Sequence, residues 1–131
     1  MPKKLKPFSA VLIPVDREGV DIHLVWGRAV SRKTVAAYAE EIGYPRARLP
    51  KGASGVCFSV EDSENGPAIL LALAFDWVGD AYQHGVLAHE IFHAVEGIKR
   101  FIGVRYRPAA GEDWAYLIGD LVSSAVKALE T

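Results

Sequence analysis

Two histidines and a glutamate in the segment His89-Glu90-Ile91-Phe92-His93 are the residues of this chain best suited to chemistry, because they form the pattern H-E-x-x-H. Residues four apart lie one turn above each other on a helix, so the two imidazoles would converge on one point. Neutral imidazole nitrogen is a good ligand for Zn²⁺. Glu90 would lie off that axis, close enough to take a proton from a water molecule that the metal activates. The pattern predicts a zinc site able to hydrolyse an amide.

Two histidines do not complete a zinc site, so a third protein ligand is needed. Glu112 is the strongest candidate, because it opens the next predicted helix nineteen residues after His93 and would reach the site if the two helices pack side by side. Asp113 is its nearest competitor, and Asp120 is a weaker one. The alternative explanation of Glu112 is an ordinary acidic residue in a first helical turn, where the helix dipole favours it.

The other histidines and Glu96 fit this site poorly. His84 would lie about 140° around the helix from the ligand face. His23 belongs to an upstream strand, where we expect it to face solvent. Glu96 shares the ligand face but would lie roughly 10 Å along the axis from His89, so we expect it to be a helix-end charge.

The elements that must position these residues are strands and helices in the order β-β-α-β-β-α-α. Periodicity and turn signals predict strands Val11–Val15, Ile22–Trp26, Val56–Val60 and Ala68–Phe75, a helix Thr34–Ile42 capped by Ser31, a helix from Asp80 to about Arg100, and a helix from Gly111 or Glu112 to about Leu129. The alternation in the second strand predicts that it is half-buried, and Asp80 with Gln83 has the spacing of a capping box. The order predicts one α+β domain over residues 1–131, with the first strands forming one sheet and the last two helices packed on it.

The bulk properties limit the partners of this domain. The 131 residues carry a net charge of -1, which gives no global attraction to nucleic acid or to anionic lipid. Cys57 is the one cysteine of the chain, so no intrachain disulfide forms. The longest apolar run, Ala68–Phe75, is far shorter than the roughly 20 residues of a membrane span. The N-terminal segment predicts a strand rather than a signal peptide, so we expect a cytoplasmic protein that binds neither membrane nor nucleic acid.

The two sequences HEIFHAVEG and GEDWAYLIGDLV resemble the small gluzincin-type zinc metallopeptidases. They are especially similar to the short H-E-x-x-H proteins encoded by tailed phages and prophages. The resemblance implies a zincin-like fold, with His89, His93 and Glu112 as zinc ligands and Glu90 as the general base. It covers about Leu87 to Leu121.

The resemblance leaves two supporting roles open. Better-known gluzincins carry an aspartate one turn after the third ligand, where this chain has Tyr116, and Asp120 could substitute for it. An edge strand aligns the substrate in such enzymes, and Ala68–Phe75 occupies the corresponding place, although its apolar character fits a buried strand equally well. The side chains that could stabilise an oxyanion are Tyr82, His84, Arg105, Tyr106 and Tyr116.

Two functions are consistent with these observations. The first is a zinc-dependent metallopeptidase that acts on a peptide or protein substrate, with Glu90 as general base. The alternative is a non-catalytic, zinc-stabilised zincin-like module that serves as a virion or regulatory interaction protein. A virion-associated location follows if the chain is phage-encoded.

Overall fold

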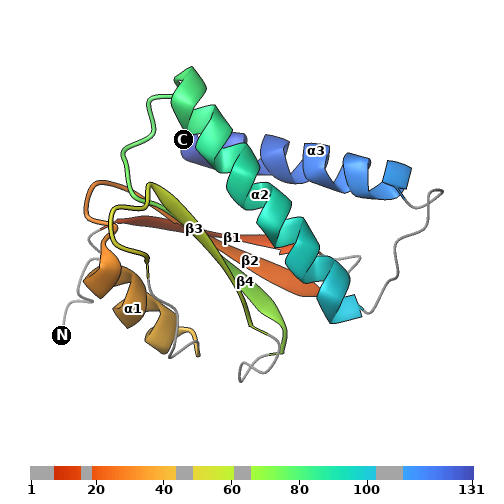
Figure 1. Ribbon diagram of the computed structural model, residues 1–131, viewed down its shortest axis with the longest axis horizontal. Coiled ribbons are helices and arrows are strands. Elements are labelled where there is room, and N and C mark those ends of the chain that lie inside the picture. Colours follow the sequence, from red (N-terminus) through yellow and green to blue (C-terminus); the bar gives the residue numbers. More distant parts are fainter. Residues whose placement is uncertain (1–7, 16–18, 44–48, 61–65, 103–110) are drawn as a thin grey trace.

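A computed structural model of the chain describes residues 8–15, 19–43, 49–60, 66–102 and 111–131, without the side chains at positions 60, 102 and 111–113. The described part is an α+β arrangement in the predicted order (Figure 1). Its elements are β1 (Ser9–Val15), β2 (Val20–Trp26), α1 (Arg32–Glu41), β3 (Gly55–Val60), β4 (Ala68–Leu73), α2 (Ala81–Ile102) and α3 (Gly111–Leu129). Each predicted element is confirmed to within about two residues at its ends. None of these helices combines the length and the apolar character that crossing a bilayer would require.

The described strands form one mixed sheet in the order β1-β2-β4-β3. The two central strands, β2 and β4, are parallel, with Ile22 opposite Ile69 and Leu24 opposite Leu71. β1 and β3 pair antiparallel to them at the two edges. All six residues of β4 are buried. The interpretation of this segment as an exposed edge is therefore wrong. The alternative, a buried strand, is confirmed, because a strand covered by helices on both faces is apolar along its whole length.

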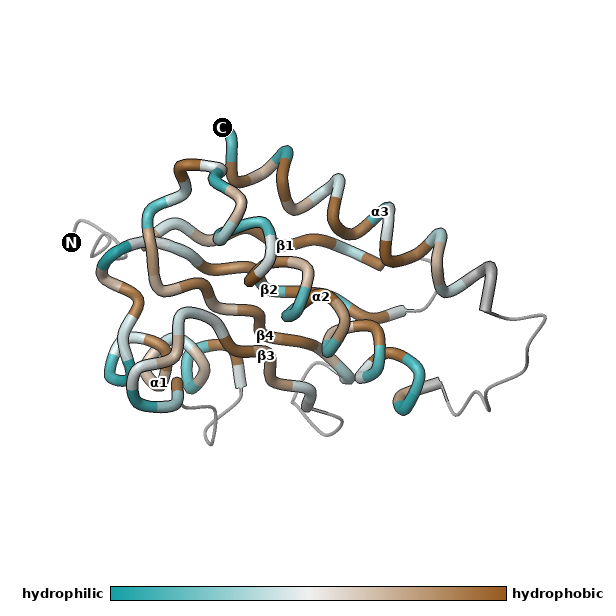
Figure 2. Tube along the Cα trace, turned by 45° about the horizontal axis from the view of Figure 1, so that its top comes forward, coloured by the Kyte–Doolittle hydropathy of each residue, from teal (hydrophilic) through white to brown (hydrophobic). Residues whose placement is uncertain are grey.

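Helices cover both faces of the sheet. α2 and α3 lie on one face and α1 lies on the other (Figure 1). On the first face Ile22, Leu24 and Leu71 join a hydrophobic cluster with buried residues of α2 and α3. On the second, Val25 and Leu70 pack with residues of α1. Figure 2 shows the resulting concentration of hydrophobic residues along the central strands.

The burial of both faces corrects two predictions about β2. Val25 is fully buried beneath α1, so the strand is not half-buried as its alternation predicted. His23 is partly buried, and its Nδ1 lies 3.4 Å from the hydroxyl of Tyr38 on α1. It therefore packs against a helix instead of facing solvent. Both predictions were wrong because α1 covers the face of the sheet on which Asp21, His23 and Val25 lie, and the alternation of polar and apolar residues indicated that this face was exposed.

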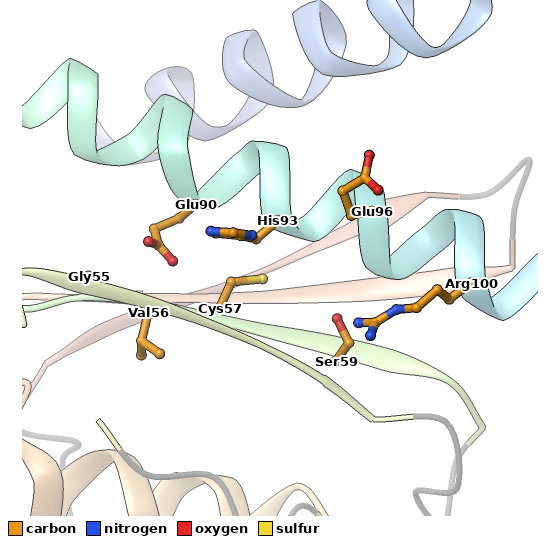
Figure 3. A pocket seen from close by; sticks show the side chains of 8 residues that line it. All are labelled: Gly55, Val56, Cys57, Ser59, Glu90, His93, Glu96 and Arg100. Atoms are coloured by element: carbon orange, nitrogen blue, oxygen red, sulfur yellow. The ribbon is translucent and has the colours of Figure 1, made fainter. Parts of the chain in front are cut away.

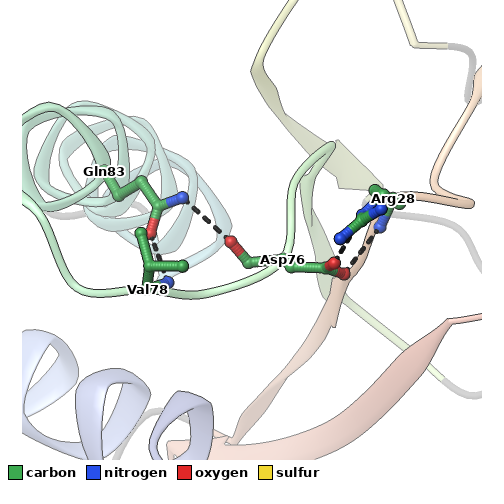
Figure 4. A network of polar contacts seen from close by, with 4 residues as sticks. All are labelled: Arg28, Asp76, Val78 and Gln83. Carbon is green, nitrogen blue, oxygen red and sulfur yellow. Dashed lines mark hydrogen bonds and ion pairs between the residues drawn. The ribbon is translucent and has the colours of Figure 1, made fainter.

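The start of α2 is fixed by Gln83, a buried polar residue. Its backbone N–H donates to Asp80 Oδ1 at 2.8 Å, as expected for an N-cap. Its side chain accepts from the backbone N–H groups of residues 78 and 79 and donates from Nε2 to the carbonyl of Asp76 at 2.9 Å (Figure 4). The side chain of Asp76 in turn accepts from Arg28 Nε at 2.7 Å. The predicted capping box is thus half formed, and its glutamine fixes the segment that leads into α2.

Candidate functional site

The two histidines of the H-E-x-x-H segment converge as their spacing predicted. The Nε2 atoms of His89 and His93 lie 3.1 Å apart, and the rings meet edge to face. Two nitrogens bound to one tetrahedral Zn²⁺ at ordinary bond lengths lie roughly 3.3 Å apart. The same separation suits a hydrogen bond between the rings when one of these nitrogens carries a proton. The pair therefore has the spacing of two zinc ligands, and both side chains are exposed at the surface of α2.

Glu90 lies beside this pair in a different environment. The residue is buried, whereas the side chain of His89 next to it is 69% exposed. Its Oε1 lies 3.8 Å from His89 Nε2. Burial raises the pKa of the Glu90 carboxyl, and positive charge on either imidazole lowers it. Burial and a raised pKa thus set this carboxyl apart from the two exposed imidazoles beside it.

Glu90 and His93 face a groove of about 450 Å³ between α2 and the edge strand β3, which we call the α2–β3 groove (Figure 3). One wall is α2, which contributes Glu90, His93, Glu96 and Arg100; the other is β3, which contributes Gly55, Val56, Cys57 and Ser59. β3 is also the last strand of the sheet in the described part of the chain, so no described strand pairs with its outer edge.

Small residues bring α2 and β3 close together along this groove. A Cβ added at Gly55 would lie 2.9 Å from a methyl carbon of Val86 and 3.2 Å from Glu90 Cγ. A Cβ added at Gly97 would overlap the hydroxyl of Ser59. Gly55 does not have a left-handed backbone conformation, so the space it leaves, and not its φ angle, explains the glycine. This space is what allows Glu90 to lie between the helix and the strand.

Cys57 lies on β3 beneath His93 (Figure 3). Burial raises the pKa of its thiol to about 12, the charge of Glu90 adds to this rise, and the charge of Arg100 opposes it. The thiol is therefore protonated at neutral pH and is a poor metal ligand in this environment.

The described residues do not supply a third metal ligand. They contain no group of three histidine, cysteine, aspartate or glutamate side chains that could hold one ion. Glu112 opens α3, but its side chain and that of Asp113 lie outside the described part, so their assignment stays a prediction. Asp120 is exposed on α3. Glu96 lines the groove but does not join the two histidines: its carboxylate points away from β3 (Figure 3) and pairs with Lys99 at 3.2 Å.

The packing of α3 on α2 locates the first turn of α3 relative to the histidines. The ammonium of Lys99 lies 5.3 Å from the centre of the Trp114 ring. Lys99 follows His93 by six residues, which is roughly 9 Å along the helix axis. The first turn of α3 therefore lies beside the last turns of α2, and a ligand at Glu112 would have to reach back toward His93.

The side chains proposed for oxyanion stabilisation are dispersed. Tyr82 lies at the start of α2, and its hydroxyl is 2.8 Å from Ser54 Oγ. His84 bonds the carbonyl of Asp80 through Nδ1 and packs against Trp77. Tyr116 is exposed on α3, and Arg105 and Tyr106 lie outside the described residues. None of the three described candidates lines the α2–β3 groove.

Sequence reasoning missed the contribution of β3 to this site. Gly55, Cys57 and Ser59 alternate with Val56 and Phe58, and the small members of this series face α2. That alternation is a usable signal, because small residues on one face of a strand favour close approach of a helix. For Arg100, the sequence pattern indicates only that the helix ends near this residue.

Comparison with known proteins identifies no relatives: the chain matches no protein-family model, no curated protein and no solved structure.

Proposed function

We propose that this protein is a zinc-dependent peptidase with a small zincin-like fold. The observation that carries the proposal is the 3.1 Å separation of the His89 and His93 Nε2 atoms beside the buried carboxylate of Glu90. Support also comes from the edge strand β3, which lies along the same groove.

His89 and His93 would hold the ion, with Glu112 as the proposed third ligand and Asp113 and Asp120 as the alternatives. A zinc ion bound there would supply a Lewis acid able to lower the pKa of water and to polarise a peptide carbonyl. Glu90 takes the proton of the attacking water and passes it to the leaving amine. Burial raises the pKa of Glu90, which makes its carboxylate a stronger base than that of an exposed glutamate and favours the first of these transfers.

The substrate proposed for this groove is an extended peptide. The outer edge of β3 offers backbone N–H and C=O groups that an added strand can pair with, as in other cases of β-strand addition. Such pairing recognises the main chain of the substrate and requires no particular side chain. It would bring one peptide bond opposite Glu90 and His93.

The decisive experiment measures metal content and cleavage on the same samples. Purified wild-type protein is expected to hold about one zinc per chain and to cleave members of a peptide library. Glu90→Gln should keep the metal and lose cleavage by roughly 10²- to 10⁴-fold. Glu40→Gln, an exposed change on α1 across the sheet, is the matched control and should keep both. A Glu90→Gln variant as active as wild type would overturn the role of Glu90.

The same measurements separate the alternative function. Full zinc occupancy in wild type, with no cleavage of any library member, would support a non-catalytic zinc-stabilised interaction module instead. Metal affinities of Glu112→Gln, Asp113→Asn and Asp120→Asn identify the third ligand, because only its loss should weaken binding by about tenfold or more. Wild-type protein free of any transition metal after preparation in zinc would exclude both functions.

A further inference from the structure

The α2–β3 groove carries a positive charge at one end. Arg100 follows His93 by seven residues on the same face of α2, and its guanidinium points back over Ser59 into the groove (Figure 3). Among the described residues its guanidinium has no hydrogen-bond or ion-pair partner. The nearby carboxylate of Glu96 is already paired with Lys99. The charge of Arg100 is thus directed at whatever occupies the groove.

The electrostatics of the groove agree with this geometry. The positive charge of Arg100 acts on the thiol of Cys57, whose pKa it lowers against the larger effect of burial. The influence of the guanidinium therefore reaches the part of β3 that lies beneath His93. An arginine in this position is suited to a carboxylate, because its planar group donates two parallel hydrogen bonds to the two oxygens.

We infer that Arg100 is a specificity-determining residue that binds a carboxylate of the substrate about three residues from the scissile bond. Seven residues of helix extend about 10 Å, and an extended peptide covers that distance in about three residues. The carboxylate is either an aspartate or glutamate side chain or the C-terminal carboxylate of a short peptide. The inference rests on the proposed peptidase function, since it takes Glu90 and His93 as the position of the reacting bond.

The test uses binding, so that it does not depend on turnover. The full-length Glu90→Gln protein, loaded with zinc, is titrated into fluorescein-labelled alanine-rich octapeptides and followed by fluorescence anisotropy. A single glutamate is moved through the peptide and compared at each position with glutamine, and each peptide is made with a free and with an amidated C-terminus. The substitutions Arg100→Gln and Arg100→Lys are tested in the Glu90→Gln background. Lys33→Gln, which removes a positive charge on α1 across the sheet, is the control.

We expect a carboxylate at one register to tighten binding roughly five- to tenfold over its neutral counterpart. Arg100→Gln should abolish this preference, Arg100→Lys should reduce it, and Lys33→Gln should leave it unchanged. A preference for the free C-terminus identifies a terminal carboxylate, and a preference for glutamate identifies a side chain. No preference at any position, or a preference that survives Arg100→Gln, overturns the inference.

The outcome for the peptidase is read separately, by incubating wild type with the peptides. Cleavage without any carboxylate preference overturns the role of Arg100 and leaves the peptidase standing. A carboxylate preference that depends on Arg100, without cleavage by wild type, overturns the peptidase and leaves Arg100 as an acid-binding residue of an interaction module.

Discussion

Glu90 and His89 are adjacent in sequence but lie in opposite environments. A helix turns about 100° per residue, so adjacent side chains point in different directions. His89 points away from the sheet, and Glu90 points toward the sheet. The glutamate is buried against β3, while the histidine remains exposed and within 3.8 Å of it. Rotation about the helix axis therefore places two exposed imidazoles and one buried carboxyl side by side within five residues, which is the arrangement that the proposed peptidase requires.

The thiol of Cys57 should be unreactive in the folded, metal-free protein. With its pKa raised from 9.0 to about 12, the thiolate fraction at pH 8 falls by roughly a hundred- to a thousandfold relative to an ordinary cysteine. In EDTA-treated protein, a disulfide reagent should label Cys57 slower by about that factor than it labels the urea-unfolded chain. Equal rates in the two states would show that the thiol is not held in a desolvated site.

The same thiol should make stability depend on pH in the alkaline range. Its folded pKa lies above the unfolded value, so above about pH 9 the unfolded chain releases a proton that the folded chain keeps. The contribution is complete below pH 9 and is lost as the pH rises toward 12. Urea unfolding of metal-free Cys57→Ala should therefore show a shallower loss of stability between pH 9 and 11 than wild type. Parallel curves would contradict this assignment.

At the scale of elements, the contact of α2 with β3 creates the groove. Gly97 on the helix meets Ser59 on the strand, and Gly55 leaves room for Glu90. Larger side chains at these positions would push the helix away from the sheet edge.

The helices and strands themselves could be predicted from sequence, because apolar periodicity and the capping residues Ser31 and Asp80 are local signals.

The neighbours of each element could not be predicted in the same way. Strand order depends on pairing between segments far apart in the chain, so the sequence left β4 equally suited to an edge and to the centre. Its six buried residues follow from its position between β2 and β3, with helices over both faces. The choice among Glu112, Asp113 and Asp120 as the third ligand could not be made from sequence for the same reason. It depends on how α3 crosses α2.

A double-mutant cycle tests the close contact between the two elements. Alanine is the better helix former by about 1 kcal/mol, yet Gly97→Ala should destabilise the protein by about 1–3 kcal/mol because the new methyl group overlaps the Ser59 hydroxyl. In a Ser59→Ala background the same change should cost at least about 1 kcal/mol less. Gly85→Ala is the control on the same helix, since its methyl group would meet nothing within 4 Å. Urea unfolding measures all four variants. Additive effects would mean that the helix and strand are not in contact at this point.

For the whole molecule, the hydrophobic interior and the candidate metal site are separate. One cluster lies between the sheet and the two helices α2 and α3, and the other lies beneath α1. Neither cluster includes His89 or His93, and both histidines are exposed at the surface. Burial of this apolar surface is the main favourable term in folding, and it does not require an ion at the site.

The protein should therefore stay folded when no metal is bound to the candidate site. EDTA-treated protein is expected to keep its far-ultraviolet circular dichroism spectrum at 25 °C and to unfold cooperatively, unlike small zinc domains that are unfolded without metal. Zinc at a hundredfold excess over its Kd should then add about 2.7 kcal/mol and raise the Tm by roughly 10 °C. The double variant His89→Ala, His93→Ala should fold equally well without metal, and its Tm should not rise when zinc is added. Loss of the helical signal on chelation would contradict this prediction. It would mean that the free energy of metal binding, and not the hydrophobic clusters alone, keeps α2 folded.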